Sequence, residues 1–292
     1  MARTATSGTP RTAQINRVLL GLLAANLAVL LAKVMIGLKS GSLAVAGDAV
    51  HSSVDAMNNV LALAVSWVAA LAPDEDHPYG HRKFETLGAL AIVIFLSISG
   101  FEVVKGAVSR LISGAEPLDI SNFDLAVLAG TLGVNALVAL YESRRGRELS
   151  SELLLADAAH TKADVFITLG VITGVVLSRA GFGFADPLVA LLVAAAIVII
   201  AYGILVRAIP VLVDQHVVQS NQVRASAEHI AGVHRAYNIR SRGSPDQTFA
   251  ELTIAVEGSA TVEQAHLIAD AVEDSLKAEF GLNEIVVHVE PC

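Results

Sequence analysis

The chain has 292 residues, of which 54% are hydrophobic and only 16% are charged. Soluble domains usually carry about 25% charged residues, so this composition argues against a soluble protein. The formal net charge is −8 and the basic residues form no large cluster, which argues against a nucleic-acid-binding protein. The single cysteine, Cys292, cannot form a disulfide within the chain.

Residues 1–15 are rich in Ser, Thr, Gly, Pro and Arg, which is typical of a disordered tail and not of a signal peptide. Six apolar segments follow, each of about 20 residues or more, the length at which a helix crosses a bilayer. They cover about Val18–Leu38, Leu43–Ala72, Leu87–Ile112, Phe123–Tyr141, Leu153–Leu177 and Leu188–Val213. The sequence therefore predicts an all-α transmembrane domain of six helices over residues 16–213, with a basic link over residues 144–147.

From residue 214 onward the composition changes and short amphipathic patterns appear. Helical patterning covers Gln219–Ala231 and Thr261–Phe280, and strand-like patterning covers Ala236–Ser241, Phe249–Val256 and Glu284–Val289. This αββαβ order predicts a small α+β, ferredoxin-like domain over residues 214–292.

The basic residues predict how the segments are oriented in the membrane. With the amino terminus in the cytoplasm, basic residues gather on the inner side, as is usual for membrane proteins. The inner ones are Arg3, Arg11, Arg17, Arg82, Lys83, Arg144, Arg145, Arg147 and Arg207. The outer ones are Lys39, Arg110 and Arg179. This bias predicts that both termini lie in the cytoplasm.

The second and fifth apolar segments carry the same motif, D-A-x-H-x-x-x-D, at residues 48–55 and 157–164. On a helix, positions i and i+4 share a face, so each histidine lies beside the aspartate that follows it. If the two helices face each other, two nitrogens and two oxygens converge, a set that suits a tetrahedral divalent metal and zinc above all. The predicted ligands are His51, Asp55, His160 and Asp164.

A single H-x-x-x-D is a weak signal, because His266 and Asp270 form a third copy in a soluble-looking stretch. Ionisable residues are costly inside a bilayer and are retained there mainly where they function. The location of the first two copies therefore favours a metal site over a structural polar network.

Asp48 and Asp157 lie three residues before each histidine, on the same helical face. We expect them to orient the imidazoles or to relay protons. The alternative, a buried aspartate hydrogen-bonded to Ser, Thr or Asn of a neighbouring helix, stays open, with Asn26 and Asn135 as candidate partners.

Together, the six segments, the paired motif, the loop D-x-x-H-P-Y-G-H at residues 74–81 and the α+β tail resemble the cation diffusion facilitators. The resemblance is strongest to bacterial zinc and iron efflux members. It implies a homodimeric transporter that exchanges a divalent metal for protons by alternating access. It also implies that the protein is not an enzyme. It also implies a plasma or inner membrane location, and it implies no organic cofactor.

The same resemblance assigns residues. It places the transport site at His51, Asp55, His160 and Asp164, with a histidine at position 51 where many bacterial relatives have Asp. It implies a second metal site at Asp74, His77 and His81. It implies a cytoplasmic metal site at His234, His266, His288 and Glu290, although Thr253 stands where some relatives have a further histidine. It also implies a charged pair between Lys83 and Asp214.

These assignments predict zinc efflux driven by protons. Metal ligands must lose their protons to bind, and histidine titrates near neutral pH, so metal and protons compete for one site. A nitrogen in place of an oxygen disfavours manganese and magnesium. Iron, cobalt, cadmium and manganese stay open as alternative substrates. A membrane metal sensor is a further alternative, and so is an intramembrane metalloenzyme, although the chain has no H-E-x-x-H motif.

Overall fold

The computed structural model describes residues 10–40, 43–113, 121–182, 185–244 and 247–292, and within the second helix the description of side chains begins at Ser52. The chain divides between Ala208 and Ile209 into two compact units.

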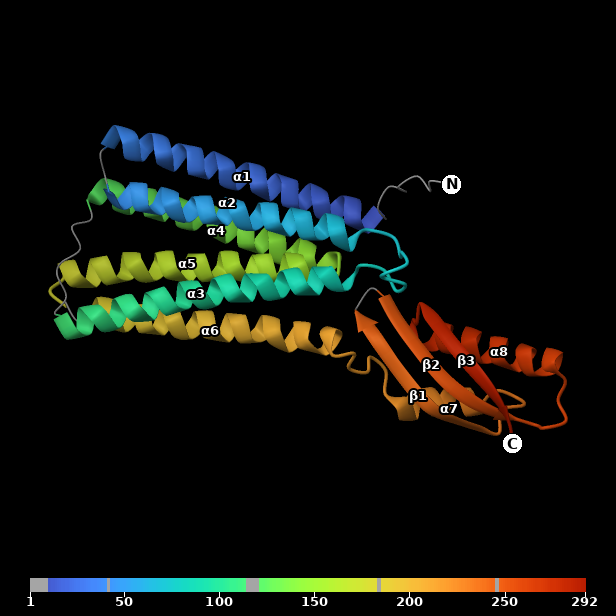
Figure 1. The fold of residues 1–292 in the computed structure, drawn as a ribbon. Helices are drawn as coiled ribbons and strands as arrows, with labels where there is room; N and C mark the ends of the chain where they lie inside the picture. The colour runs from blue at the N-terminus through green and yellow to red at the C-terminus, as the bar shows by residue number, and fades with distance from the viewer. Residues whose placement is uncertain (1–9, 41–42, 114–120, 183–184, 245–246) are drawn as a thin grey trace. The chain divides into compact units, whose positions relative to one another are not determined.

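Six long helices make up the described part of the first unit (Figure 1). They are α1 (Pro10–Ser40), α2 (Leu43–Ala69), α3 (Lys83–Ser113), α4 (Asn122–Glu148), α5 (Glu152–Arg179) and α6 (Ala185–Leu212). Among the described residues, five helices are long and apolar enough to cross a membrane, namely α1, α3, α4, α5 and α6. Membrane-crossing helices are therefore confirmed for five predicted segments, while the sixth span, in α2, stays a prediction.

Helix α4 extends beyond the segment that hydrophobicity alone predicts. Its last turn carries Arg144 and Arg145, whose guanidinium groups lie 2.9 and 2.7 Å from the carboxylate of Glu148. Pairs at these spacings support a helix. At the other end, Ser121 and Asp124 form a capping box. The prediction of a link over residues 144–147 is therefore wrong, because ion pairing keeps this polar stretch helical.

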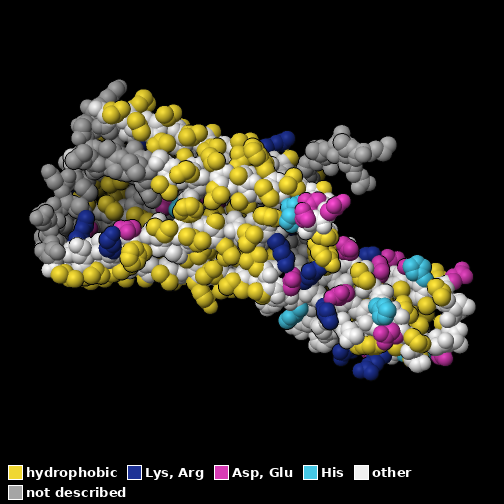
Figure 2. All heavy atoms as spheres, in the orientation of Figure 1, with side chains coloured by type: hydrophobic (Ala, Val, Ile, Leu, Met, Phe, Trp, Pro, Cys, Tyr) yellow, Lys and Arg dark blue, Asp and Glu magenta, His cyan; other side chains and the backbone are white. Residues whose placement is uncertain are grey.

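An apolar core holds the first unit together, and α1, α2, α3, α5 and α6 all contribute to it. Leu19, Leu96, Leu154 and Ile197 are among its almost fully buried members. The outside of the helices is also apolar, and hydrophobic side chains cover most of the helical surface visible in Figure 2. A surface of this kind is solvated well by lipid and poorly by water.

Polar contacts fasten one end of the first unit. Arg11 on α1 donates hydrogen bonds to the carbonyl oxygens of Leu149 and Ser150, at 2.7 and 2.8 Å. Glu85 on α3 lies 3.3 Å from Arg11 and also accepts a hydrogen bond from the Ser151 hydroxyl. These contacts tie α1 and α3 to the turn between α4 and α5.

The second unit contains α7 (Ser220–Glu228), β1 (Arg235–Ser244), β2 (Gln247–Val256), α8 (Val262–Phe280) and β3 (Glu284–Pro291). The predicted αββαβ order is confirmed. The strands lie in the order β1-β2-β3, with β2 antiparallel to β1 and parallel to β3. Helix α8 joins the two parallel strands, because such a pair cannot be connected by a tight turn.

Both helices of the second unit pack on the sheet (Figure 1). Val223 of α7, Val272 and Leu276 of α8, and Ile254 of β2 are fully buried in their shared core. The unit is therefore a small α+β domain, and its ferredoxin-like assignment stays a prediction.

Candidate metal centre

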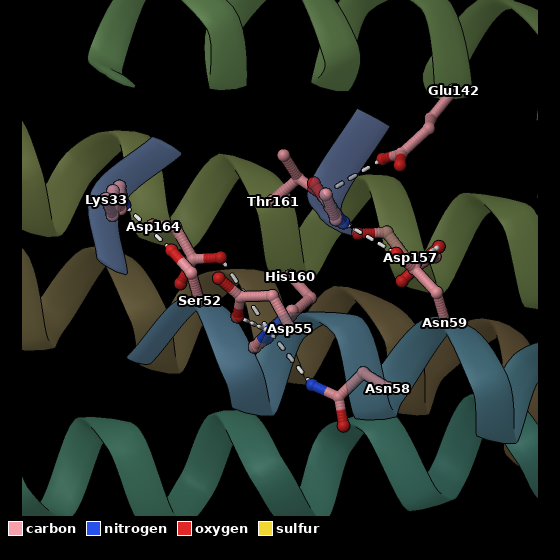
Figure 3. Close-up of polar contacts among 11 residues, drawn as sticks. Lys33, Ser52, Asp55, Asn58, Asn59, Glu142, Asp157, His160, Thr161 and Asp164 are labelled. Carbon is pink, nitrogen blue, oxygen red and sulfur yellow. Dashed lines mark hydrogen bonds and ion pairs between the residues drawn. The ribbon is translucent and has the colours of Figure 1, made fainter. Parts of the chain in front are cut away.

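Helices α2 and α5 bring three of the predicted ligands together (Figure 3). His160 Nε2 lies 3.4 Å from Asp55 Oδ1 and 3.7 Å from Asp164 Oδ2. One ligand atom from each of the three side chains lies within 4.8 Å of the other two. His160 and Asp164 are buried and Asp55 is half-buried. We refer to Asp55, His160 and Asp164 as the buried trio.

The local sequence explains how the buried trio forms. His160 and Asp164 are one helical turn apart on α5, so they share a face by helix geometry alone. Asp55 comes from α2, and it reaches them because α5 presents buried alanines on this side, including Ala156, Ala159 and Ala163. Small residues let helices approach closely. Helix packing therefore supplies the one contact of the trio that no local motif contains.

The donor set of the trio suits a divalent cation. An imidazole nitrogen and two carboxylate oxygens are ligands for zinc and for other first-row metals. Bonds of about 2 Å to a central ion place tetrahedral ligand atoms about 3.3 Å apart, and the separations from His160 Nε2 are 3.4 and 3.7 Å. The side chains of His51 and Asp48 lie outside the described residues, so their roles stay predictions.

Asn58, which the sequence analysis did not select, also contacts the trio. Its Nδ2 lies 3.1 Å from His160 Nε2, the atom that faces both carboxylates. The same nitrogen also lies within hydrogen-bond distance of Asp55 Oδ1, at 3.4 Å, so Asn58 and Asp55 share this atom of the imidazole. The amide of Asn58 thus lies at the imidazole nitrogen that a metal would use. A pair of adjacent asparagines in an apolar stretch was the signal in the sequence.

The second of these asparagines, Asn59, holds Asp157. Its Nδ2 donates to Asp157 Oδ2 at 3.1 Å, and its Oδ1 accepts from Asn26 Nδ2 at 2.6 Å. The contacts run from α1 through α2 to α5. They match the hydrogen-bonded alternative for Asp157 that the sequence left open, and they include Asn26, one of the two candidate partners.

Two more buried polar side chains lie near the trio and were missed. Glu142 on α4 accepts a hydrogen bond from the Thr161 hydroxyl at 3.0 Å. Lys33 on α1 donates to the Ser52 hydroxyl at 2.8 Å. Each lies in a helix where the sequence showed no motif, so only the packing of neighbouring helices reveals their proximity to the trio.

The predicted loop residues Asp74, His77 and His81 also come together. His77 Nδ1 lies 3.0 Å from Asp74 Oδ1, and His81 Nε2 lies 3.4 Å from Asp74 Oδ2. One ligand atom from each residue lies within 4.8 Å of the others. The backbone N–H of His77 lowers the pKa of Asp74 below its usual value, with smaller contributions from both imidazoles. The carboxylate is therefore ionised and able to bind a cation.

Three of the four residues predicted to bind metal in the second unit lie in two separate pairs within one chain. His266 lies 3.7 Å from Asp270, and His288 lies 3.5 Å from Glu290. Glu290 also accepts a hydrogen bond from the Tyr237 hydroxyl, which raises the pKa of Tyr237. Thr253 lies opposite His288 in the β2–β3 register and is buried.

The fourth predicted residue, His234, belongs to a different group. His234 precedes β1, Glu257 follows β2 and Cys292 follows β3. The register therefore brings these residues together at one end of the three strands. Backbone hydrogen bonds of 2.9 Å from His234 N to Ala255 O and from Cys292 N to Val256 O fix two of them. One ligand atom from each of His234, Glu257 and Cys292 lies within 4.8 Å of the others. We refer to these three residues as the sheet-end trio.

The predicted pair of Lys83 and Asp214 joins residues of different units, and it stays a prediction. Lys83 begins α3 in the first unit. Asp214 Oδ2 lies 3.8 Å from Arg242 Nη1 within the second unit.

Comparison with known proteins places these sites in context. Residues 19–213 match the family model of the cation efflux transmembrane domain. Residues 217–292 match the model of the cation efflux protein cytoplasmic domain.

Curated relatives match over most of their length. The manganese efflux system protein MneS of Bacillus subtilis is 26% identical, over 92% of this chain and 93% of its own. The cation-efflux pump FieF of Shewanella oneidensis is 28% identical, over 89% of this chain and 88% of its own. Metal tolerance protein C1 of Arabidopsis thaliana is 30% identical, over 92% of this chain and 61% of its own. With both of its units matched, the chain belongs to the cation efflux family, the cation diffusion facilitators, and it is a multi-pass membrane protein.

Proposed function

We propose that this protein exports zinc from the cytoplasm in exchange for protons, with the buried trio and His51 as the transport site. The observation that carries the proposal is the convergence of Asp55, His160 and Asp164 inside a unit of membrane-length helices. Two carboxylates and an imidazole would be an expensive combination in a bilayer without a cation to bind.

Zinc is favoured by the nitrogen ligands. One imidazole is present in the buried trio, and His51 would add a second. Nitrogen ligands favour zinc, cobalt and iron over manganese, which prefers an all-oxygen set. Manganese is nevertheless the second candidate, because two relatives are named as manganese efflux proteins.

Protons and metal would compete for the same atoms. His160 must present an unprotonated Nε2 to the ion, and both carboxylates must be ionised. Binding from the cytoplasmic side would move Asn58 away from Nε2 and release protons on that side. After the site turns outward, protons from outside would bind to these atoms and displace the metal.

The surrounding architecture follows from the family. Residues 10–15, which the sequence analysis assigned to a disordered tail, belong to helix α1, where Arg11 is hydrogen-bonded and Ile15 is buried. We infer six spans over residues 16–213 and a cytoplasmic, ferredoxin-like domain over residues 214–292. Both termini would lie in the cytoplasm of a cell whose plasma or inner membrane holds the protein. The working unit would be a homodimer, in which Lys83 and Asp214 connect the spans to the cytoplasmic domains.

Two accessory sites would respond to metal. The loop site uses Asp74, His77 and His81, which share one small volume. In the cytoplasmic unit the family pattern assigns His234, His266, His288 and Glu290. Within one chain, however, His234 is grouped with Glu257 and Cys292, so we infer that the sheet-end trio is the group that binds metal there.

A flux assay in proteoliposomes tests the transport proposal. The purified protein is reconstituted around a zinc-sensitive dye, and a pH gradient is imposed across the vesicle membrane. We expect zinc to enter in response to the gradient in the wild type and not in Asp164→Ala. The matched control is Asp270→Ala, because it removes the same residue from an exposed H-x-x-x-D pair.

The same assay separates the competing functions. Cobalt, cadmium, iron and manganese replace zinc in parallel runs, and their rates rank the substrates. A folded, zinc-binding wild type with no flux for any metal would point to a sensor or a metalloenzyme. Full zinc flux in Asp164→Ala would leave the transporter proposal standing and overturn the assignment of its site.

A further inference from the structure

Glu142 on α4 is the most deeply buried acidic residue among those the structure describes, with 0% of its surface exposed. It lies within a helix long and apolar enough to cross a membrane. It is not one of the ligands of the buried trio. The transport site as proposed therefore leaves this carboxyl group without a role.

The hydrogen bonds of Glu142 leave its charge largely uncompensated. Thr161 Oγ1 donates to Glu142 Oε2 at 3.0 Å, and the same hydroxyl lies 3.2 Å from the carbonyl oxygen of Asp157. A hydroxyl has one hydrogen, so it serves only one of these acceptors at a time. The other oxygen, Oε1, is buried and has no hydrogen-bond partner among the described residues.

The charged groups around Glu142 come mainly from α5. Asp157 and Asp164 carry charges of the same sign as its carboxylate, and His160 can carry the opposite charge. Of the other helices that touch α4, α2 carries Asp55, and α1 carries Lys33, whose ammonium group is bound to Ser52. In Figure 3, Lys33 lies on the side of the trio away from Glu142.

A fully buried carboxylate next to other carboxylates is costly in a low-dielectric interior, so the neutral acid is favoured while the trio holds no metal. A divalent cation in the trio reverses this balance. Thr161, the partner of Glu142, is the residue next to His160 in the chain. The two added positive charges at His160 attract a negative charge at Glu142, and they do so without direct coordination.

We propose that Glu142 carries one of the exchanged protons and is coupled to the metal through the electric field and not as a ligand. This inference rests on the proposed transport function. When metal binds from the cytoplasm, the O–H bond of Glu142 breaks and the proton leaves to the cytoplasm. When metal departs outward, the carboxylate takes a proton from outside. Each cycle thus carries one metal ion out and one proton in by way of Glu142, in addition to any protons held by the ligands.

Counting protons tests the proposal directly. Zinc is titrated into the purified, full-length protein in weakly buffered detergent solution that contains a pH indicator. We expect Glu142→Gln to bind zinc and to release one proton fewer per zinc than the wild type. Glu142→Asp keeps a titratable carboxyl and should release the wild-type number. Glu148→Gln is the matched control, because it removes the same group from the partly exposed end of the same helix, and it should also match the wild type.

The outcomes are distinct. An unchanged proton count in Glu142→Gln overturns the proposal, and so does a folded Glu142→Gln protein that no longer binds zinc, because Glu142 would then act as a ligand. A wild type that binds no zinc overturns the proposed function itself.

Infrared difference spectra of the wild type provide a second measurement that does not depend on the folding of a variant. Zinc binding should remove a carbonyl band of a protonated carboxylic acid, and this band should shift in Glu142→Asp. Zinc binding without loss of such a band would also overturn the proposal.

Discussion

Helices α5 and α8 carry the same H-x-x-x-D pair with the same internal distance, yet the two pairs lie in opposite surroundings. His160 Nε2 and His266 Nε2 each lie 3.7 Å from the aspartate one turn later. The side chains of the α5 pair are only 6% exposed, whereas those of the α8 pair are 76% and 52% exposed. Helix geometry sets the distance in both pairs. Tertiary packing brings a third possible ligand, Asp55, to the α5 pair, and among the described residues no such group forms at the α8 pair.

This comparison shows what a short motif can and cannot specify. The spacing fixes which two side chains share a face. It does not specify a third ligand, a dry environment or a second helix. Those come from the apolar sequence on either side of the motif, which places α5 inside a bundle and leaves α8 on the surface of a small sheet.

The largest expected effect is on zinc affinity when the histidine of each pair is replaced by alanine. His160→Ala should weaken zinc binding to the transport site by more than about 100-fold, because changes even to groups that only orient metal ligands cost 10–100-fold. His266→Ala should leave that affinity within about twofold. Zinc titration of the two purified variants with a competing chelator measures both. Similar losses in the two variants would show that burial does not distinguish the two pairs.

The next effect concerns the hydrogen bonds that support the buried pair. Asn59→Ala removes the donor to Asp157 and leaves a buried carboxylate oxygen without that bond. We expect a loss of about 1–3 kcal/mol in the free energy of unfolding, the usual cost of an unsatisfied buried polar group. Thermal denaturation in detergent measures it, with Asn221→Ala, at an exposed position of helix α7, as the control. Equal stability of the two variants would contradict a supporting role for Asn59.

A smaller effect is expected at the sheet-end trio. Because Cys292 is the only cysteine, a thiol reagent reports on this position alone. Zinc should slow the labelling of Cys292 by about tenfold in the wild type and should not slow it in His234→Ala or Glu257→Gln, since a metal-bound thiolate is shielded from reagents. His288→Ala, a neighbouring variant outside this trio, should behave like the wild type. Protection that persists without both His234 and Glu257 would contradict the assignment.

The smallest effect concerns the pH dependence of the exposed loop. The pKa of Asp74 is lowered in the folded loop, so its ionised form stabilises the loop above its unfolded pKa of about 3.9. That contribution is lost as the pH falls through the lower, folded pKa. Between pH 7 and pH 5, the protection factor of the His77 amide, which is the factor by which its exchange is slower than in an unfolded chain at the same pH, should therefore stay constant in the wild type and be smaller in Asp74→Asn. Equal protection factors in the two proteins would contradict the role of the Asp74 carboxylate as an acceptor for the His77 N–H.

Much of the fold followed from the sequence, because it depends on local patterns. Five apolar segments and the αββαβ order emerged from hydrophobic period alone. The end of α4 did not, since it depends on ion pairs of Glu148 with Arg144 and Arg145, which keep a polar stretch helical. Element boundaries depend on such side-chain contacts, which an average over hydrophobicity does not detect.

The candidate site divides in the same way. His160 and Asp164 were readable as a pair because one turn of helix relates them. Asn58 and Glu142 could not be selected from the sequence, since each lies near the site only through a hydrogen bond to a residue on another helix. Likewise, the grouping of His234 with Cys292 depends on which strand ends lie next to each other in the sheet, and the spacing along the chain does not predict this arrangement.

The contacts of Arg11 join three parts of the helical unit at one of its ends. One guanidinium group ties α1 to the backbone of the α4–α5 turn and to Glu85 on α3. Any motion that separates these helices at this end must exchange all three contacts for water at the same time. These contacts should therefore form and break cooperatively, so this end of the unit should be found either closed or open, with few molecules in intermediate states.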